Sequence, residues 1–190
     1  MNKRGEVVEV VKERILDAAL VEFALRGYEG ATIRSIANRA KVNVAMISYY
    51  FRGKKGLYKA VLERHLDEFV SSLDNIPSDG IEGIKFFVRK HVEVLRKRGP
   101  LTSLVVMREI VFPSDTFLEL KKNFYEVIVD KLSRVIRDAM DKGYIRALDL
   151  NFVAQFLIHL DFWFSFKFAE LDEAILAERI LEVFLKGVGS

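Results

Sequence analysis

The nucleophilic and acid–base side chains of this chain do not form a catalytic pattern. Its 190 residues include no cysteine, which excludes disulfides, cysteine-ligated zinc and thiol catalysis. The three histidines, His65, His91 and His159, are far apart and none belongs to an H-E-x-x-H motif. No serine lies in a G-x-S-x-G elbow and there is no glycine-rich phosphate loop. We therefore expect no enzyme, no metal and no cofactor; metal sensing through histidines and carboxylates is an alternative that the spacing does not support.

Positive charge is concentrated in the first third of the chain. Residues 1–65 contain 13 lysines and arginines against 7 acidic residues, whereas residues 66–190 contain 17 against 20. No acidic residue occurs between Glu29 and Glu63, a stretch that holds seven basic ones. Such a local field suits a polyanion. A solvated basic face, or a helical module that binds acidic proteins, is the alternative interpretation.

Helical periodicity recurs from end to end and predicts an all-α protein of about nine helices. Glycine and proline separate most of the helical segments, because both residues favour turns. The expected helices span residues 8–26, 33–40, 44–50, 54–73, 81–98, 101–111, 115–142, 149–170 and 172–187. Gly27 is placed to end the first helix, and Thr32 and Asn43 can cap the second and third.

The second and third expected helices are short and are joined by the three residues Lys41–Asn43. This is the spacing of a helix-turn-helix, whose second helix can enter the major groove of DNA. Its outward positions hold small or polar side chains, so that the backbone can come close to the base edges. Two short amphipathic helices also occur in ordinary α-bundles, so the pattern alone leaves both interpretations open.

The order of residues around this turn resembles the signature of TetR-family repressors. The resemblance lies in the segments 32–37, 40–45 and 47–58, and in 15–19 and 23–28 of the first helix. It implies an N-terminal three-helix DNA-binding domain at residues 1–55 and a helical domain for dimerisation and ligand binding at 56–190. It further implies a sequence-specific, ligand-responsive repressor that binds a palindromic DNA operator as a homodimer and releases the DNA when an inducer binds.

The resemblance also assigns roles to residues, by position. Groove-facing residues are expected at Val44, Ala45, Met46, Ser48 and Tyr49, and phosphate contacts at Thr32, Tyr50 and Lys54. The predicted DNA-binding set also includes Arg34 and Asn43. Lys41 stands where the family commonly has glycine, so either a left-handed lysine is tolerated or the turn differs, and Ser48 stands where many relatives have tyrosine. Packing of Tyr49 and Tyr50 against neighbouring helices is the alternative to DNA contact.

The C-terminal half is expected to supply the partner face and the ligand site. The run Phe152–Phe168 is apolar nearly all round but is interrupted by polar residues and is too short to span a membrane, so we expect a cytoplasmic protein that does not bind membranes. Apolar stripes on the last two helices predict a homodimer interface at Phe156, Leu176, Ile180 and Phe184. A pocket for a small apolar or aromatic inducer is predicted at Phe87, His91, Met107, Arg108, Phe124, His159, Phe162 and Trp163. Ordinary core packing is the alternative for each of these residues.

Overall fold

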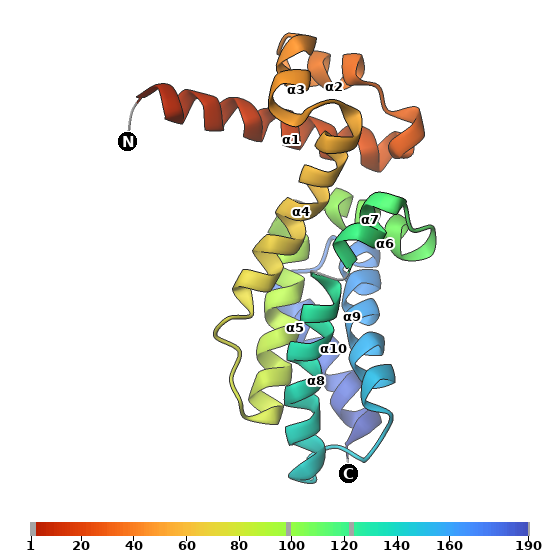
Figure 1. Cartoon of the computed structure of the whole chain (residues 1–190). Coiled ribbons are helices and arrows are strands. Elements are labelled where there is room, and N and C mark those ends of the chain that lie inside the picture. Colours follow the sequence, from red (N-terminus) through yellow and green to blue (C-terminus); the bar gives the residue numbers. More distant parts are fainter. Residues whose placement is uncertain (1–2, 98–99, 122–123, 190) are drawn as a thin grey trace. The chain divides into compact units, whose positions relative to one another are not determined.

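The computed structural model describes residues 3–97, 100–121 and 124–189, and within these ranges the chain is almost entirely helical (Figure 1). The helices are α1 Lys3–Gly30, α2 Ile33–Ala40, α3 Val44–Phe51, α4 Lys54–Ser72, α5 Gly80–Lys97, α6 Pro100–Val111, α7 Asp115–Lys121, α8 Tyr125–Asp141, α9 Leu150–Lys167 and α10 Glu173–Val188. The prediction of an all-α fold is confirmed. The single helix expected over 115–142 is wrong, because the structure has α7 and α8 as separate helices there.

The chain divides into two compact units. The first, here called the head, comprises the described parts of residues 1–64 together with 104–118. The second, the body, comprises the described parts of 65–103 and 119–190. Three helices, α4, α6 and α7, therefore have residues in both units. The predicted domain boundary at residue 55 concerns function and stays a prediction.

The head is built on α1, which packs against α2. Ile15, Ala19 and Phe23 recur at steps of four along α1 and are buried, as expected for one face of an amphipathic helix. Ile36 of α2 and Ile47 of α3 are completely buried as well. Gly27 interrupts the helical backbone of α1 with φ 71° and ψ 173°, a conformation that only glycine adopts without strain.

A buried polar contact links residues 104–118 to α4 within the head. Tyr58 of α4 donates its hydroxyl hydrogen to the carboxylate of Glu109, which also accepts from the backbone N–H of Ser114 at 2.8 Å. The ring of Tyr58 lies against Phe23 and Tyr28, with centroid distances of 4.7 and 5.0 Å. Burial and the adjacent Glu109 carboxylate both raise the pKa of Tyr58, so this hydroxyl stays protonated and donates.

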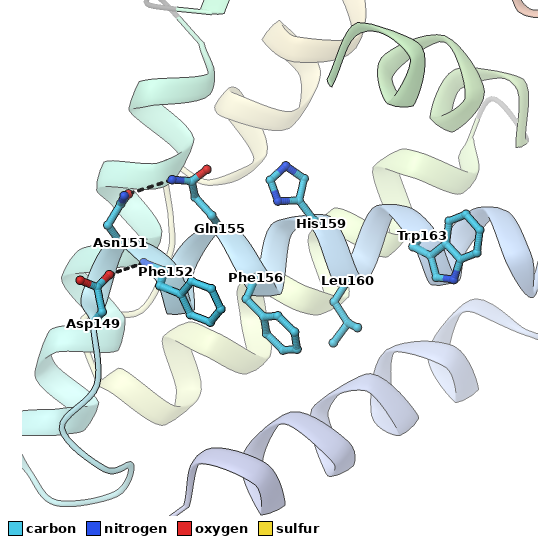
Figure 2. A pocket seen from close by; sticks show the side chains of 8 residues that line it. All are labelled: Asp149, Asn151, Phe152, Gln155, Phe156, His159, Leu160 and Trp163. Atoms are coloured by element: carbon cyan, nitrogen blue, oxygen red, sulfur yellow. Dashed lines mark hydrogen bonds between the residues drawn. The ribbon is translucent and has the colours of Figure 1, made fainter. Parts of the chain in front are cut away.

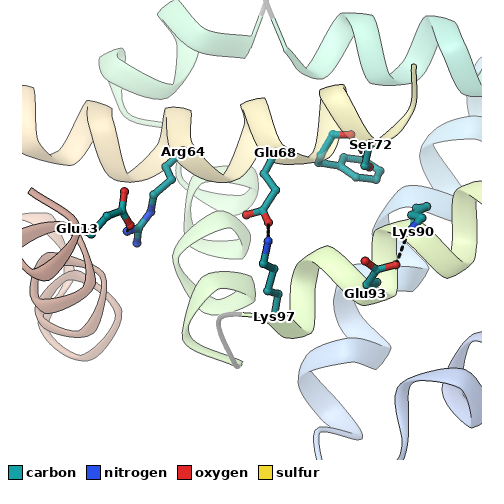
Figure 3. A network of polar contacts seen from close by, with 8 residues as sticks. Glu13, Arg64, Glu68, Ser72, Lys90, Glu93 and Lys97 are labelled. Atoms are coloured by element: carbon teal, nitrogen blue, oxygen red, sulfur yellow. Dashed lines mark hydrogen bonds and ion pairs between the residues drawn. The ribbon is translucent and has the colours of Figure 1, made fainter. Parts of the chain in front are cut away.

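Helix α4 makes ion pairs in each unit (Figure 3). In the head, Arg64 lies 3.0 Å from both Glu13 and Asp17 of α1. In the body, Glu68 pairs with Lys97 of α5. Exposed pairs of this kind contribute little to stability, but they fix which face of α4 lies toward each neighbour.

The body is a bundle of α5, α8, α9 and α10, which run side by side (Figure 1). The start of α5 lies very close to the end of α8. A Cβ atom on Gly80 would lie 2.3 Å from the backbone nitrogen of Ala139, and one on Gly83 would lie 2.6 Å from Val135 Cγ1. The N–H of Gly80 also donates to Asp138 at 2.7 Å. These two glycines therefore set the spacing of α5 and α8.

Replacing Gly80 by alanine tests this close approach. The new methyl group must push the α8 backbone away, so we expect the free energy of unfolding to fall by about 1–3 kcal/mol, measured by urea denaturation of the full chain. Gly187→Ala is the control, because Gly187 has open space around its Cβ position and alanine is the better helix former. Equal stability of the Gly80→Ala and Gly187→Ala proteins would contradict the interpretation.

Candidate nucleic-acid interface

The start of α2 is fixed by a reciprocal capping box. Thr32 has an extended backbone and its hydroxyl accepts from the N–H of Ser35 at 3.0 Å, while the N–H of Thr32 donates to the Ser35 hydroxyl at 3.3 Å. The sequence predicted that Thr32 caps α2, but not that the Ser35 side chain completes the capping box. Thr32 is exposed, so the start of the helix, where backbone N–H groups favour anions, faces solvent.

The turn between α2 and α3 uses a left-handed lysine. Lys41 has φ 53° and ψ 49°, a conformation that costs a non-glycine residue roughly 1–2 kcal/mol. Arg14 of α1 offsets part of this cost, because its guanidinium donates to the carbonyl oxygens of Ala40 at 2.6 Å and Lys41 at 3.3 Å. Of the two possibilities that the sequence left open, the left-handed lysine is the one observed.

Helix α3 buries one residue and exposes the side expected to face DNA. Asn43 caps it by accepting from the N–H of Ala45 at 2.8 Å, as predicted, and Ile47 anchors it in the core. Phe51 is only half-buried. Along the opposite side, Val44, Ala45, Ser48 and Tyr49 are exposed and Met46 is partly exposed.

The two tyrosines of α3 have different surroundings. Tyr49 is 81% exposed, and its ring contact is with Tyr50 next to it, at a centroid distance of 5.1 Å. Tyr50 is half-buried and lies near the ammonium group of Lys12, 6.0 Å from the ring centroid. Tyr49 therefore points its phenol into solvent, while Tyr50 is partly packed against α1.

Lys54 is held in place at the start of α4. Its ammonium group donates to the backbone oxygen of Glu29 at 3.2 Å and lies 4.5 Å from the centre of the Tyr28 ring. An ammonium group has three N–H donors, so further donors remain for a phosphate. Arg34, the other cation of the predicted set, is exposed on α2.

The sequence did not reveal how sharply the chain turns between α3 and α4. Arg52 caps α3 in the left-handed region with φ 58°, and Gly53 follows with φ 104°. Gly56 lies so close to α3 that a Cβ atom there would be 1.9 Å from the carbonyl oxygen of Phe51. The two glycines on either side of Lys54 and Lys55 were the available signal for this turn.

The buried carboxylate of Glu22 pairs with two arginines of the head. Glu22 of α1 is 2% exposed and accepts from Arg39 Nε at 2.8 Å, while Arg26 lies 3.1 Å away. Burial alone would raise the pKa of Glu22, but hydrogen bonds from Arg39 and Ser35 and the charges of both arginines outweigh burial and lower that pKa. Arg39 therefore helps to hold α2 on α1 through Glu22, while its side chain stays 43% exposed.

The geometry of the head suits the major groove of DNA. An exposed, capped helix of eight residues presents small and polar side chains around one exposed tyrosine, and cations flank it.

Known proteins support this interpretation. A family model for the bacterial regulatory proteins of the tetR family matches residues 15–61. The HTH-type transcriptional regulator RutR of Escherichia coli K12 is 29% identical over 149 residues, which are 77% of this chain and 70% of RutR.

Residues 15–61 therefore form a DNA-binding region of the TetR type, and the chain is similar to transcriptional regulators of this family. Another relative is IcaR of Staphylococcus aureus strain Newman, the negative regulator of the biofilm operon icaADBC. It is 26% identical over 192 residues, which are 93% of this chain and all of IcaR. Among solved structures, a HlyIIR mutant protein with a linker in place of an internal segment matches with a TM-score of 0.73 and 28% identity, over 92% of this chain and 95% of that one. PfmR of Thermus thermophilus matches with a TM-score of 0.78 over 91% and 97%, and its 16% identity shows the fold alone.

The residues predicted to bind a ligand fall into three groups. Phe87, His91 and Phe162 are buried together in the body, with His91 5.5 Å from Phe87 and 4.6 Å from Phe162 between ring centroids. His159 and Phe124 are half-buried in the body. Met107, Arg108 and Trp163 do not join this cluster, because the first two belong to the head and Trp163 is exposed on α9.

Three of the four residues predicted for the dimer interface are corrected by the structure. Leu176, Ile180 and Phe184 of α10 are only 2–3% exposed within the single chain, because they pack toward the other helices of the body. Phe156 is half-exposed, and its place in the dimer interface stays a prediction. It lines a hollow of about 840 Å³ along one side of α9, together with Trp163 and His159 among others (Figure 2).

Two further properties of the described residues bear on the alternatives. No group of three or more histidines and carboxylates in these ranges is arranged to hold a metal ion. No helix in the same ranges is both long and apolar enough to cross a membrane. The structure therefore gives no support to the metal-sensing alternative.

Replacing Glu22 by glutamine should loosen α2 from α1. The amide keeps the shape but loses the charge, so we expect the free energy of unfolding at pH 7 to fall by about 1–3 kcal/mol. Because the folded pKa of Glu22 lies below its ordinary value of about 4.5, its contribution is complete above that pH and is lost as the pH falls through the folded pKa. Denaturation curves of the two proteins should therefore converge in acid. Glu9→Gln, at the exposed pair with Lys12, is the control and should change little; a Glu22→Gln effect that is the same at pH 3 and pH 7 would refute the assignment.

Proposed function

We propose that this TetR-family chain is a repressor that binds a palindromic DNA operator as a homodimer, and that a small apolar or aromatic inducer bound in the body releases it. The observation that carries the proposal is the exposed side of α3, centred on Tyr49, on a helix whose opposite side is anchored by buried Ile47. Repression is favoured by the relative IcaR, a negative transcriptional regulator. We propose residues 1–55 for DNA binding and 56–190 for dimerisation and ligand binding.

The DNA contacts that we propose divide by chemistry. Val44, Ala45, Ser48 and Tyr49 are exposed on α3 and suit base edges and thymine methyl groups in the major groove. Met46, partly exposed, would lie at the border of that surface. The contacts to phosphate are assigned to a separate set in the head, which is Thr32, Arg34, Asn43, Tyr50 and Lys54. Phosphate contacts position the protein, whereas base contacts specify the sequence.

The homodimer that we propose uses the exposed apolar side chains of α9 and α10. Phe152, Phe156 and Trp163 of α9 are 48–68% exposed, as are Ile175 and Val183 of α10. Monomeric proteins rarely expose so many large apolar side chains on neighbouring helices. These residues take the place of Leu176, Ile180 and Phe184, which belong to the core of the single chain.

The inducer acts, in this proposal, through helices that the two units share. Helix α4 begins at Lys54 in the head, next to α3 in the sequence, and ends at Ser72 in the body. A two-fold dimer can bind successive major grooves only if its recognition helices lie roughly 34–36 Å apart or at a related whole-turn spacing. A ligand that shifts the body end of α4 can therefore lower operator affinity without unfolding either unit.

Selection of binding sites from random duplex DNA by the purified protein tests the proposal as a whole. We expect an enriched palindromic sequence whose half-sites are separated by one helical turn or a multiple of it, and a protein that sediments as a dimer. A salt titration then separates specific from general attraction, because non-specific binding collapses first as salt rises. Enrichment of no sequence, with binding only to acidic proteins, would favour the interaction-module alternative.

Replacing Tyr49 by alanine tests direct readout. We expect the best site to lose about 1–3 kcal/mol of binding free energy and the preferred base beneath this side chain to change, as measured by selection and by fluorescence anisotropy on duplexes that differ at one base pair. Tyr144→Ala removes a tyrosine of the body that is 51% exposed and should leave binding unchanged. An equal loss on every sequence would make Tyr49 a phosphate contact.

A charge on the outer side of α10 tests the dimer interface. Val183→Glu adds no strain to the single chain because Val183 is 68% exposed, so we expect a folded protein that sediments as a monomer and binds the palindrome at least tenfold more weakly. Phe112→Glu is the control: Phe112 is 80% exposed but lies in the head, and the dimer should persist. A dimeric Val183→Glu protein would place the interface elsewhere.

A further inference from the structure

The core of the body contains polar side chains that its helices leave incompletely paired. His91 of α5 and Asp161 of α9 are completely buried, and His91 Nδ1 lies 3.1 Å from Asp161 Oδ2. The second atom of each group, His91 Nε2 and Asp161 Oδ1, has no hydrogen-bond partner in the described residues. The same holds for the hydroxyl of Ser165, one helical turn after Asp161 on α9 and only 2% exposed.

Aromatic rings surround the imidazole of His91 on several sides. Phe69 of α4 stacks on it at a centroid distance of 4.3 Å, and Phe162 of α9 meets it edge-on at 4.6 Å. Phe87 lies 5.5 Å away. Three polar atoms without partners in such an apolar setting are unusual, because buried polar groups in folded proteins are nearly always hydrogen-bonded.

The charges around the cluster select the kind of group that can pair with it. Burial lowers the pKa of His91, with the charges of His65 and His159 acting in the same direction, and burial raises the pKa of Asp161. Burial therefore disfavours the charged form of each of these two groups. In the part of the chain that the structure describes, no lysine or arginine pairs with His91, Asp161 or Ser165, so an anion would find no fixed cation. A cation would have only the Asp161 carboxyl group as a partner, and burial disfavours the charged form of that group.

We infer that His91, Asp161 and Ser165 bind the polar head of the inducer, and that this head is an uncharged amide-type group on an apolar body. An amide suits the cluster because it offers an acceptor and a donor side by side, matching the hydroxyl of Ser165 on one side and the His91–Asp161 pair on the other. For the molecule to reach His91, Phe69 or Phe162 must rotate, because both rings lie against the imidazole. The inference rests on the proposed function, since it names the chemistry of the inducer of that repressor.

Four probes that share one apolar body test the inference: 3-phenylpropanamide, 3-phenylpropylamine, 3-phenylpropanoate and propylbenzene. The full chain is labelled with ¹⁵N-histidine, so that its three imidazoles can be followed separately, with His91 assigned by its absence in His91→Gln. We expect only the amide to shift the His91 resonances with saturation and to weaken binding to the selected operator by at least fivefold. Tighter binding of the amine or the carboxylate, equal binding of propylbenzene, or amide binding that leaves operator affinity unchanged would overturn the inference.

Variants distinguish a ligand site from a structural cluster. Ser165→Ala removes an unpaired buried hydroxyl, so the protein without ligand should be as stable as the unaltered one or more so, while amide affinity falls at least fivefold. Asp161→Leu should also lose amide binding, and Thr116→Val, at a buried position in the head, should keep it. Unchanged amide affinity in Ser165→Ala would refute the assignment. Operator selection without any ligand is measured first: its failure would overturn the proposed function, whereas selective DNA binding without amide binding would overturn only this inference.

Discussion

The surface that we propose to face DNA depends on holding two very short helices in place. Helices α2 and α3 have eight residues each, and isolated helices of that length do not persist in water. They form here because Ile36 and Ile47 are buried in the head and because side chains complete the hydrogen bonds at their ends. Arg14 serves the end of α2 from α1, and Glu22 ties Arg39 of α2 to the same helix. These contacts all lie on the inner side of the two helices. The outer side of α3 stays exposed.

Much of the head could be predicted from the sequence because its determinants are local. Caps at Thr32 and Asn43, the buried position of Ile47 and the exposure of Tyr49 each follow from residues within one or two helical turns. The contacts missed were those between residues distant in sequence. Nothing near Arg14 indicates that it would bind carbonyl groups 26 positions away, and local signals cannot show which carboxylate neutralises Arg39.

The body was predicted less well. Its sequence shows that the helices are apolar, but not which side of each helix faces the core. Helix α9 is apolar nearly all round, and α10 has apolar residues on both sides, so periodicity cannot say which side is the core. Ile180 proved buried and Val183 exposed, although both are aliphatic and only three residues apart. Met107 was expected beside a body pocket, yet residues 104–118 belong to the head. Only long-range contacts, such as Tyr58 with Glu109, decide such questions.

The helices that have residues in both units limit the routes by which a ligand in the body, as we propose, could change DNA binding by the head. Helix α6 holds the buried, unpaired hydroxyls of Thr102 and Ser103 in the body and Glu109 in the head. Within the head, Glu109 accepts from Tyr58, whose ring contacts Tyr28, and Tyr28 in turn lies under the ammonium of Lys54. Allosteric coupling typically amounts to about 1–3 kcal/mol, which is close to the strength of one hydrogen bond to a charged group. Loss of the single contact between Tyr58 and Glu109 is therefore large enough to account for the induction that we propose, without unfolding of either unit.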